Sequence, residues 1–282
     1  MKKQFSLVKG FTILMALLFT AGTGVASEIT SELDAFKDEK GTLRISGGTA
    51  HIPVMKEAAK RIMAFNPDIQ ITIAGGGSGA GIKQVGEGLV NIGNSGRKPT
   101  EKEINKYGLS MYKWALDGVT AVIHPKNPVK DLSSKELQDI YAGRISNWKT
   151  LGGDDRPINI YTRDKSSGTR SVFWKKALGK GDIAGKAHFV TSNGAMKSAV
   201  TNDPYAIGYV SVGYVDDSVA PVRLDNVTPS LATVQTGEYK VARGLYSNTK
   251  GEYSGLAKKF VQYLLSPEGQ KIAAEKGYIP VN

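Results

Sequence analysis

Apolar residues follow two different periods along this chain, and the two periods alternate. Leu43 and Ile45 lie in a run where apolar and polar positions alternate, as in a strand with one buried face. The next segment has the period of a helix, and its apolar residues share one face: Val54, Met55, Ala58, Ala59, Ile62 and Phe65. Asn66-Pro67-Asp68 ends that helix before a second alternating run at 69–73. The pattern therefore predicts strand, helix and strand in succession.

The same succession continues to the C-terminus. A glycine-rich turn leads into a helix expected at 82–89, and capping boxes at 100–103 and 133–136 predict two further helix starts. More strands are expected at 118–123, 158–161 and 206–210, and more helices at 171–178, 255–265 and 267–276. Strands that alternate with helices through short turns indicate an α/β fold with a largely parallel sheet.

The first 27 residues have the pattern of an export signal. Lys2, Lys3 and Lys9 precede a short apolar stretch at 11–19, and Val25-Ala26-Ser27 offers a small-residue cleavage site. The apolar stretch is too short to cross a membrane comfortably, which argues against a permanent anchor. We therefore expect a cleaved signal peptide over 1–27 and a secreted protein of the periplasm.

Composition narrows the class of ligand. The chain has no cysteine, which excludes disulfides and a lipid-anchored cysteine. Its net charge is +11, and the value is +8 without the three lysines of the signal segment. A basic surface suits small anions, anionic lipid or nucleic acid. The basic residues are dispersed and are not interleaved with aromatic residues, so we do not expect a nucleic-acid partner.

Three turns, each between a predicted strand and a predicted helix, carry the candidate chemistry. They are Ser46-Gly47-Gly48-Thr49-Ala50, the glycine-rich stretch at 75–81 with Ser78, and the stretch at 163–169 that begins with Arg163. Such turns lie outside the carboxyl ends of strands in open α/β sheets, where ligands bind. Glycines expose N–H groups, hydroxyls donate and accept, and a guanidinium suits an oxyanion. One such turn can equally reflect tight packing, whereas three with an arginine favour anion binding.

Nucleotide motifs are a competing interpretation of the glycine-rich turn. The glycine spacing at 76–81 fits a Walker A loop, but Ile82 stands where that motif requires lysine. A dinucleotide fingerprint could begin at Gly75, but the segment Asn94-Ser95-Gly96-Arg97 lacks the acidic residue expected about 20 positions later. Both interpretations are therefore disfavoured.

An enzyme is a second competing class. The three histidines, His51, His124 and His188, show no metal-ligand spacing, and we expect His51 to be an exposed residue at a helix start. Ser146 and Lys149 fit the spacing of a Ser–Lys pair but lack its companion motifs. We therefore expect no catalysis, no metal and no cofactor.

With these turns in view, the chain resembles the PstS-type phosphate-binding proteins, the periplasmic receptors of phosphate-uptake ABC transporters. The resemblance covers essentially all of the chain from Gly41 to Asn282. Its motifs are Gly-Gly-Thr at 47–49, the glycine-rich turn at 75–84, Asp117-Gly118, the stretch at 140–148, the arginine turn at 163–169, and the strand at 206–210.

The resemblance implies an α/β periplasmic-binding-protein fold of type II with two lobes. Each lobe is a central sheet flanked by helices, and crossover hinge strands link the two. One lobe would combine 28–120 with 242–282, and the other would span 121–241. Phosphate would bind in the cleft between the lobes, and a monomeric receptor would deliver it to a permease in the inner membrane. The implied phosphate contacts are Thr49, Ala50, Ser78, Arg163, Ser167, Gly168 and Thr169.

One departure from the family pattern affects specificity. Some members carry an aspartate in a Ser-Asp-x-Pro segment that accepts the proton of bound phosphate, whereas this chain has Ser95-Gly96-Arg97-Lys98-Pro99. Our hypothesis is that Asp117 replaces that acceptor and that Arg97 adds a positive contact. Asp117 could instead be a cap or a solvated turn residue, and Arg97 a surface cation. Sulfate, molybdate or tungstate as ligand, and a sensing role instead of transport, remain alternatives.

Overall fold

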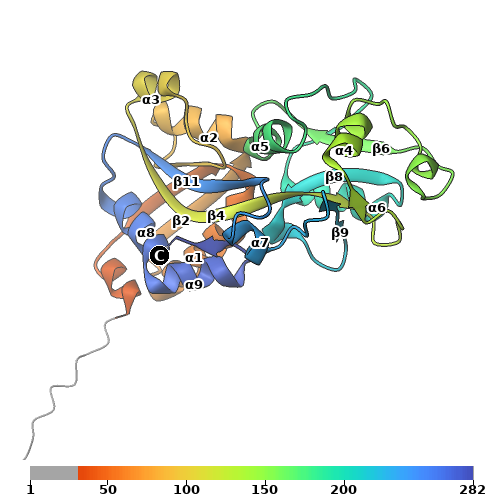
Figure 1. Ribbon diagram of the computed structural model, residues 1–282. Helices are drawn as coiled ribbons and strands as arrows, with labels where there is room; N and C mark the ends of the chain where they lie inside the picture. The colour runs from red at the N-terminus through yellow and green to blue at the C-terminus, as the bar shows by residue number, and fades with distance from the viewer. Residues whose placement is uncertain (1–30, 282) are drawn as a thin grey trace, which may run out of the picture. The chain divides into compact units, whose positions relative to one another are not determined.

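The computed structural model describes residues 31–281, so the expected signal peptide lies outside the described part (Figure 1). Within residues 31–281 there are four short 3-10 helices: η1 (Glu32–Phe36), η2 (Thr49–His51), η3 (Trp148–Leu151) and η4 (Val212–Tyr214). The α-helices are α1 (Ile52–Phe65), α2 (Gly77–Gly86), α3 (Glu101–Tyr107), α4 (Ser134–Tyr141), α5 (Gly168–Lys176), α6 (Asn193–Asn202), α7 (Leu231–Gln235), α8 (Gly255–Leu265) and α9 (Pro267–Glu275). The strands are β1 (Gly41–Gly47), β2 (Ile69–Gly76), β3 (Ile92–Ser95), β4 (Leu109–Ile123), β5 (Asp131–Leu132), β6 (Asn159–Arg163), β7 (His188–Val190), β8 (Ala206–Ser211), β9 (Ala220–Pro221), β10 (Arg223–Leu224), β11 (Ala242–Lys250) and β12 (Ile279–Pro280).

The sheet is mixed, which corrects the expectation of a largely parallel one. Its main path runs β2-β1-β3-β11-β4-β8-β6-β7. The strands at the two ends of this path are parallel to their neighbours, as the βαβ pattern predicted. The central strands β11 and β4 are antiparallel to theirs. The antiparallel part arises because β4 and β11 are the segments that carry the chain from one half of the sheet to the other.

Strand β4 is the element that both halves share. It is 15 residues long, longer than the strand expected at 118–123. Its first part, Leu109 to Gly118, pairs with β11, and its last part, Val119 to Ile123, pairs with β8. Figure 1 shows β4 running from the side of α2 and α3 toward the side of α4 and α6. Asp117 and Gly118 therefore lie where β4 passes from one half to the other.

The buried apolar side chains form two large clusters that divide along β4. One cluster gathers residues from 119–241 together with Ile279. The other gathers residues from 36–115 and 245–278, so it draws on both ends of the described chain. The helices expected from their apolar faces, α1, α8 and α9, pack into the second cluster. In residues 31–281 we find no helix long and apolar enough to pass through a membrane.

Two differences from the expected elements have physical reasons. Helix α2 begins at Gly77 and not at Ile82, because part of the glycine-rich turn is itself helical. Strand β11 was not expected, because its pattern does not alternate: polar residues such as Ser247 and Asn248 are buried together with Leu245 and Tyr246. When polar side chains of a strand are buried along with its apolar ones, apolar and polar positions do not alternate in the sequence.

Gln270 on α9 links the C-terminal segment to β4, and we expect its loss to lower the free energy of unfolding. Its Nε2 donates to the carbonyls of Trp114 (2.9 Å) and Leu264 (2.7 Å), and its Oε1 accepts from Val281 N–H (2.8 Å). Gln270→Met should lower the free energy of unfolding by about 3 kcal/mol in urea titrations, because buried backbone groups lose their partners. The exposed Gln70→Met is the matched control and should change it by less than about 0.5 kcal/mol. A loss below about 1 kcal/mol at Gln270 would contradict the assignment.

Candidate anion-binding site

The three turns found in the sequence meet around one small cavity. The first follows β1, the second lies between β2 and α2, and the third lies between β6 and α5. The cavity volume is about 10 Å³. Its lining consists of Gly48, Thr49, Ala50, His51, Gly77, Ser78, Gly96, Arg163, Ser167, Gly168, Thr169 and Arg243. The structure thus brings together every residue that the family resemblance carried over, although these residues are distributed over more than 100 positions of the chain.

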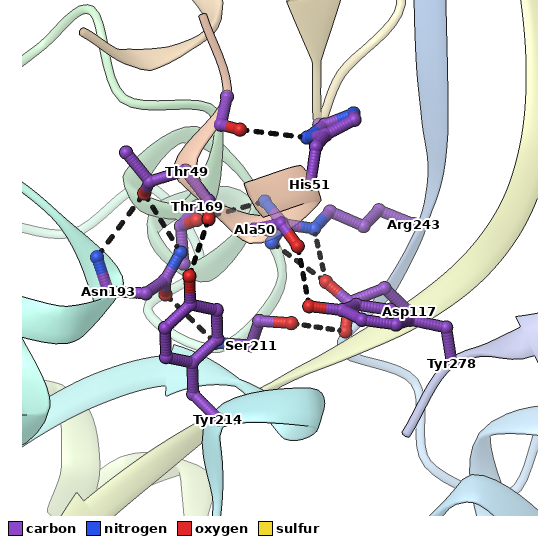
Figure 2. Close-up of polar contacts among 12 residues, drawn as sticks. Thr49, Ala50, His51, Asp117, Thr169, Asn193, Ser211, Tyr214, Arg243 and Tyr278 are labelled. Carbon is purple, nitrogen blue, oxygen red and sulfur yellow. Dashed lines mark hydrogen bonds and ion pairs between the residues drawn. The ribbon is translucent and has the colours of Figure 1, made fainter. Parts of the chain in front are cut away.

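The first turn is held in place by residues from both halves of the molecule. Thr49 Oγ1 accepts from the backbone N–H (3.2 Å) and Nδ2 (3.1 Å) of Asn193, the first residue of α6. Tyr214 donates its hydroxyl to the Thr49 carbonyl at 2.7 Å. Tyr278 likewise donates to the carbonyl of Ala50. Figure 2 shows Asn193 and Tyr214 approaching Thr49 from the same side. These bonds engage the hydroxyl and carbonyl of Thr49 and the carbonyl of Ala50, and the Gly48 N–H is bonded to the Asn94 carbonyl at 2.8 Å.

The second and third turns contact each other directly. Gly79 N–H donates to the Ser166 carbonyl at 2.9 Å, and Gly96 N–H donates to Ser78 Oγ at 2.9 Å. A Cβ added at Gly168 would lie 2.0 Å from Ser78 Oγ, so only glycine allows this approach. Ser167 caps α5, and its Oγ accepts from Arg170 N–H at 3.2 Å. Two helix starts, those of α2 and α5, therefore face the same cavity, and both carry a partial positive charge.

Arg163 is a buried cation with unused donors. Arg163 is 1% exposed, and its Nη2 donates to the Thr191 carbonyl at 2.9 Å. Among the described residues, Nε and Nη1 have no hydrogen-bond partner. Burial lowers the pKa of this guanidinium, which marks an environment that disfavours the uncompensated charge. Buried polar groups are normally satisfied, so this arrangement points to an anion that completes the site.

Arg243 is a second guanidinium at the cavity, and sequence reasoning missed it. It lies on β11 directly opposite Asp117 of β4. Its Nε donates to Asp117 Oδ2 at 2.8 Å, Nη2 lies 2.8 Å from the same oxygen, and Nη1 donates to Thr169 Oγ1 at 3.1 Å. The other carboxylate oxygen, Oδ1, accepts from Ser211 Oγ at 2.7 Å (Figure 2). Nothing in a single sequence indicates that Arg243 and Asp117 are neighbours, because the pairing depends on the register of β11.

Asp117 is placed differently from the hypothesis. It is fully buried and does not line the cavity, and both of its oxygens bond to Ser211 and Arg243. Burial raises its pKa, while the charge of Arg243 lowers it. The carboxylate therefore holds Arg243 and Ser211, and it is not among the residues that line the cavity.

Arg97 is also placed away from the cavity. Its guanidinium forms a two-pronged pair with Glu103, with nitrogen–oxygen distances of 2.7 and 2.8 Å. The hydrogen bonds from Arg97 lower the pKa of Glu103 to about 2. The neighbouring Gly96 lines the cavity in its place.

His51 was expected to be exposed, and the structure shows that this expectation is wrong. The residue is 0% exposed, lines the cavity, and packs edge-on against Trp114 with 5.6 Å between ring centroids. Burial lowers its pKa to about 3, so the ring is neutral at physiological pH. Its Nδ1 lies 3.1 Å from the Gly48 carbonyl, and this contact helps to hold the first turn.

Comparisons with known proteins give the family. A family model described as the PBP superfamily domain matches residues 34–268. The phosphate-binding protein PstS of Bacillus subtilis is 42% identical over 280 residues, which cover 95% of this chain and 92% of that protein. This chain belongs to the PstS family of the PBP superfamily. PstS of Borreliella burgdorferi is 26% identical and covers 87% of this chain and 92% of its own length.

Solved structures of family members agree with the fold. A putative phosphate ABC transporter substrate-binding protein from Clostridium perfringens, solved with bound phosphate, is 38% identical with a TM-score of 0.80, over 86% of this chain and all of that one. An ABC-type phosphate transport receptor from Vibrio cholerae is 32% identical with a TM-score of 0.68, over 84% of this chain and 99% of that one. The α/β periplasmic-binding-protein fold expected from the sequence is therefore confirmed. In the described residues no group of histidine and acidic side chains could hold a metal ion.

The buried charge of Arg163 predicts how a substitution there changes the free energy of unfolding when no anion is bound. Arg163→Met should leave the free energy of unfolding unchanged or raise it by up to about 2 kcal/mol in anion-free buffer, because it removes an uncompensated buried charge. The matched control is Arg61→Met, which removes the ion pairs that Arg61 makes with Glu57 and Glu268. The control should lower stability by up to about 1 kcal/mol. Calorimetric unfolding measures both variants, and a clear loss of stability at Arg163 would refute the interpretation.

Proposed function

We propose that this protein captures inorganic phosphate and delivers it to an ABC-transporter permease. The observation that carries the proposal is the buried Arg163, whose two unpartnered nitrogens lie at a cavity lined by hydroxyls and helix-start amides. The printed names of the relatives add support, because they describe phosphate-binding and phosphate-transport proteins. Those relatives are binding components of transporters and not enzymes, in agreement with the expectation of no catalysis.

The proposed contacts follow from the cavity lining. Arg163 supplies a planar pair of donors to the phosphate oxygens. The starts of α2 and α5 supply amides, and the hydroxyls come from each of the three turns. The assigned phosphate contacts are Thr49, Ala50, Ser78, Arg163, Ser167, Gly168, Thr169 and, in addition to those expected from sequence, Arg243. In this assignment Asp117 holds Arg243 in place, and Arg97 makes no contact with phosphate.

We also propose the two-lobe division expected from the family, with 28–120 and 242–282 in one lobe and 121–241 in the other. The two apolar clusters support it, because each draws almost wholly on one of these sets. Several hydrogen bonds cross the division at the cavity, such as Asn193 to Thr49 and Gly79 to Ser166. The anion would contact both lobes only when they are closed, so its binding shifts the population toward the closed state.

The remaining parts of the proposal concern the cell. We propose that the mature chain acts in the periplasm as a monomer after its first 27 residues are removed. The closed form would present a surface to the permease in the inner membrane. The absence of cysteine and the basic charge of the chain are compatible with this role.

Titration calorimetry tests the binding function. The protein should bind phosphate with one site per chain, and Arg163→Gln should weaken the affinity at least about a hundredfold, because a charged donor pair is lost. Arg97→Gln is the matched control, since it also removes one guanidinium, and it should stay within about threefold of the unmodified protein. Equal effects of the two substitutions would contradict the assigned contacts.

The contacts across the cavity predict how the closed state is held. Asn193→Ala removes the Nδ2 bond to Thr49 and the bond from Ser211 N–H to Oδ1. Phosphate affinity should fall about tenfold, mainly through faster dissociation measured by stopped flow, because the bonds form only on closure. Asn202→Ala at the exposed end of the same helix should leave both rate constants unchanged. A slower association with unchanged dissociation would argue against closure as the origin of the effect.

A further inference from the structure

A second, larger pocket is lined by a different part of α5 from the part that lines the anion cavity. Arg170 and Trp174 of α5, Lys165 before the helix and residues 180–183 after it line this α5 pocket. Its volume is about 500 Å³, whereas that of the anion cavity is about 10 Å³. Sites for small organic ligands typically measure about 300–1,000 Å³, so the α5 pocket has the size of such a site.

The α5 pocket gathers three cations that the protein leaves without a counter-charge. Within residues 31–281, Lys165, Arg170 and Lys180 have no carboxylate oxygen within the 4.0 Å of an ion pair. Asp182 lines the same pocket but pairs with none of them. Arg170 Nε is closed off from solvent and has no hydrogen-bond partner in the described part of the chain. Charges of one sign that share a pocket repel each other, and a bound anion would remove that repulsion.

Lys180 is held in a backbone conformation that favours glycine. Its φ is +64°, and that of Gly179 before it is +56°. The Lys180 N–H donates to the Trp174 carbonyl at 2.8 Å, which fixes this turn to the end of α5. A glycine or an asparagine would adopt the same conformation with less strain. A lysine at this position therefore indicates a role for its side chain, which lines the pocket.

Trp174 adds an aromatic surface to the cations. It is partly exposed, whereas Trp114 and Trp148 are buried. Its Nε1 donates to the Gly181 carbonyl at 2.8 Å, so the ring is held in one orientation and its only donor is already used. Ile183 contributes further apolar surface to the pocket. An indole of this kind offers a ligand its π-surface, on which a planar ring can stack.

We propose that the α5 pocket is a second binding site, and that its ligand is a phosphate monoester whose organic part carries a planar ring, as in a nucleoside monophosphate. The phosphate group lies among the three cations, and the ring stacks on Trp174. Three cations and the one carboxylate of Asp182 give the lining a net charge of +2, which matches the dianion of a monoester. The ester is too large for the anion cavity, so the two sites separate inorganic phosphate from its esters by size.

The test is titration of the full mature chain with adenosine monophosphate, with and without one equivalent of inorganic phosphate, followed by calorimetry and by tryptophan fluorescence. Adenosine monophosphate should quench the emission and bind at least about tenfold more tightly than ribose 5-phosphate, which lacks the ring, or adenosine, which lacks the charge. Inorganic phosphate should leave its affinity within about twofold, because the two sites are separate. Loss of the binding when phosphate is present would place the nucleotide in the anion cavity and overturn the inference. Absence of saturable binding below about 1 mM would also overturn it.

Variants separate the two parts of the pocket. Trp174→Leu should abolish the quenching and weaken adenosine monophosphate about tenfold, while ribose 5-phosphate stays within about twofold. The double variant Lys165→Gln with Lys180→Gln should weaken adenosine monophosphate and ribose 5-phosphate about tenfold and leave adenosine unchanged.

The matched control is the double variant Lys175→Gln with Lys186→Gln. It removes the same charge from two exposed lysines of the same region that do not line the pocket. It should keep the affinity for adenosine monophosphate within about twofold. An equal loss of affinity in the two double variants would show attraction by the overall charge and no site, and would refute the proposal.

Discussion

The ion pair between Asp117 and Arg243 is the interaction on which the site depends. It joins β4 to β11 at the place where β4 leaves one apolar cluster and enters the other. Either charge alone would be costly at this depth, because a buried ion without a partner destabilises the fold by several kcal/mol, about 3–5 in typical cases. Ser211 on β8 and Thr169 on α5 bond to the same pair. Elements from both halves of the sheet are thereby fixed around one guanidinium.

The contrast between the two cavity arginines explains how the site can be both stable and ready for a ligand. Arg243 is compensated by the protein itself, so its position does not depend on an anion. Among the described residues, the Arg163 side chain bonds to a carbonyl and to no carboxylate, and two of its nitrogens have no hydrogen-bond partner. Arg243 is a fixed part of the cavity lining, and Arg163 carries the buried charge that a bound anion would balance. This division of roles fits a receptor that must release its ligand as well as capture it.

Sequence reasoning succeeded where the signal is local and failed where it depends on register. The helices α1, α8 and α9 and the three turns follow from apolar spacing, capping residues and glycine, each of which acts within a few residues. The position of Arg243 follows from its pairing with Asp117, which is 126 positions away in the chain. Arg97 differs, because its partner is local: Glu103, six residues further along and in the first turn of α3, pairs with its guanidinium. Burial of His51 arises from β4, which brings Trp114 against it.

The apolar cluster built on β1 and α1 has a consequence for how the protein is made. Phe260 and Leu264 of α8 and Ile272 of α9 complete that cluster, so its earliest and latest segments must meet. Contacts between distant parts of a chain are slow to form, because a long loop must close first. During synthesis the N-terminal half therefore emerges without the residues that cover it, and it cannot finish folding until the last helices are made. A chain with this order of assembly exposes the apolar surface of its first half until its last two helices are available.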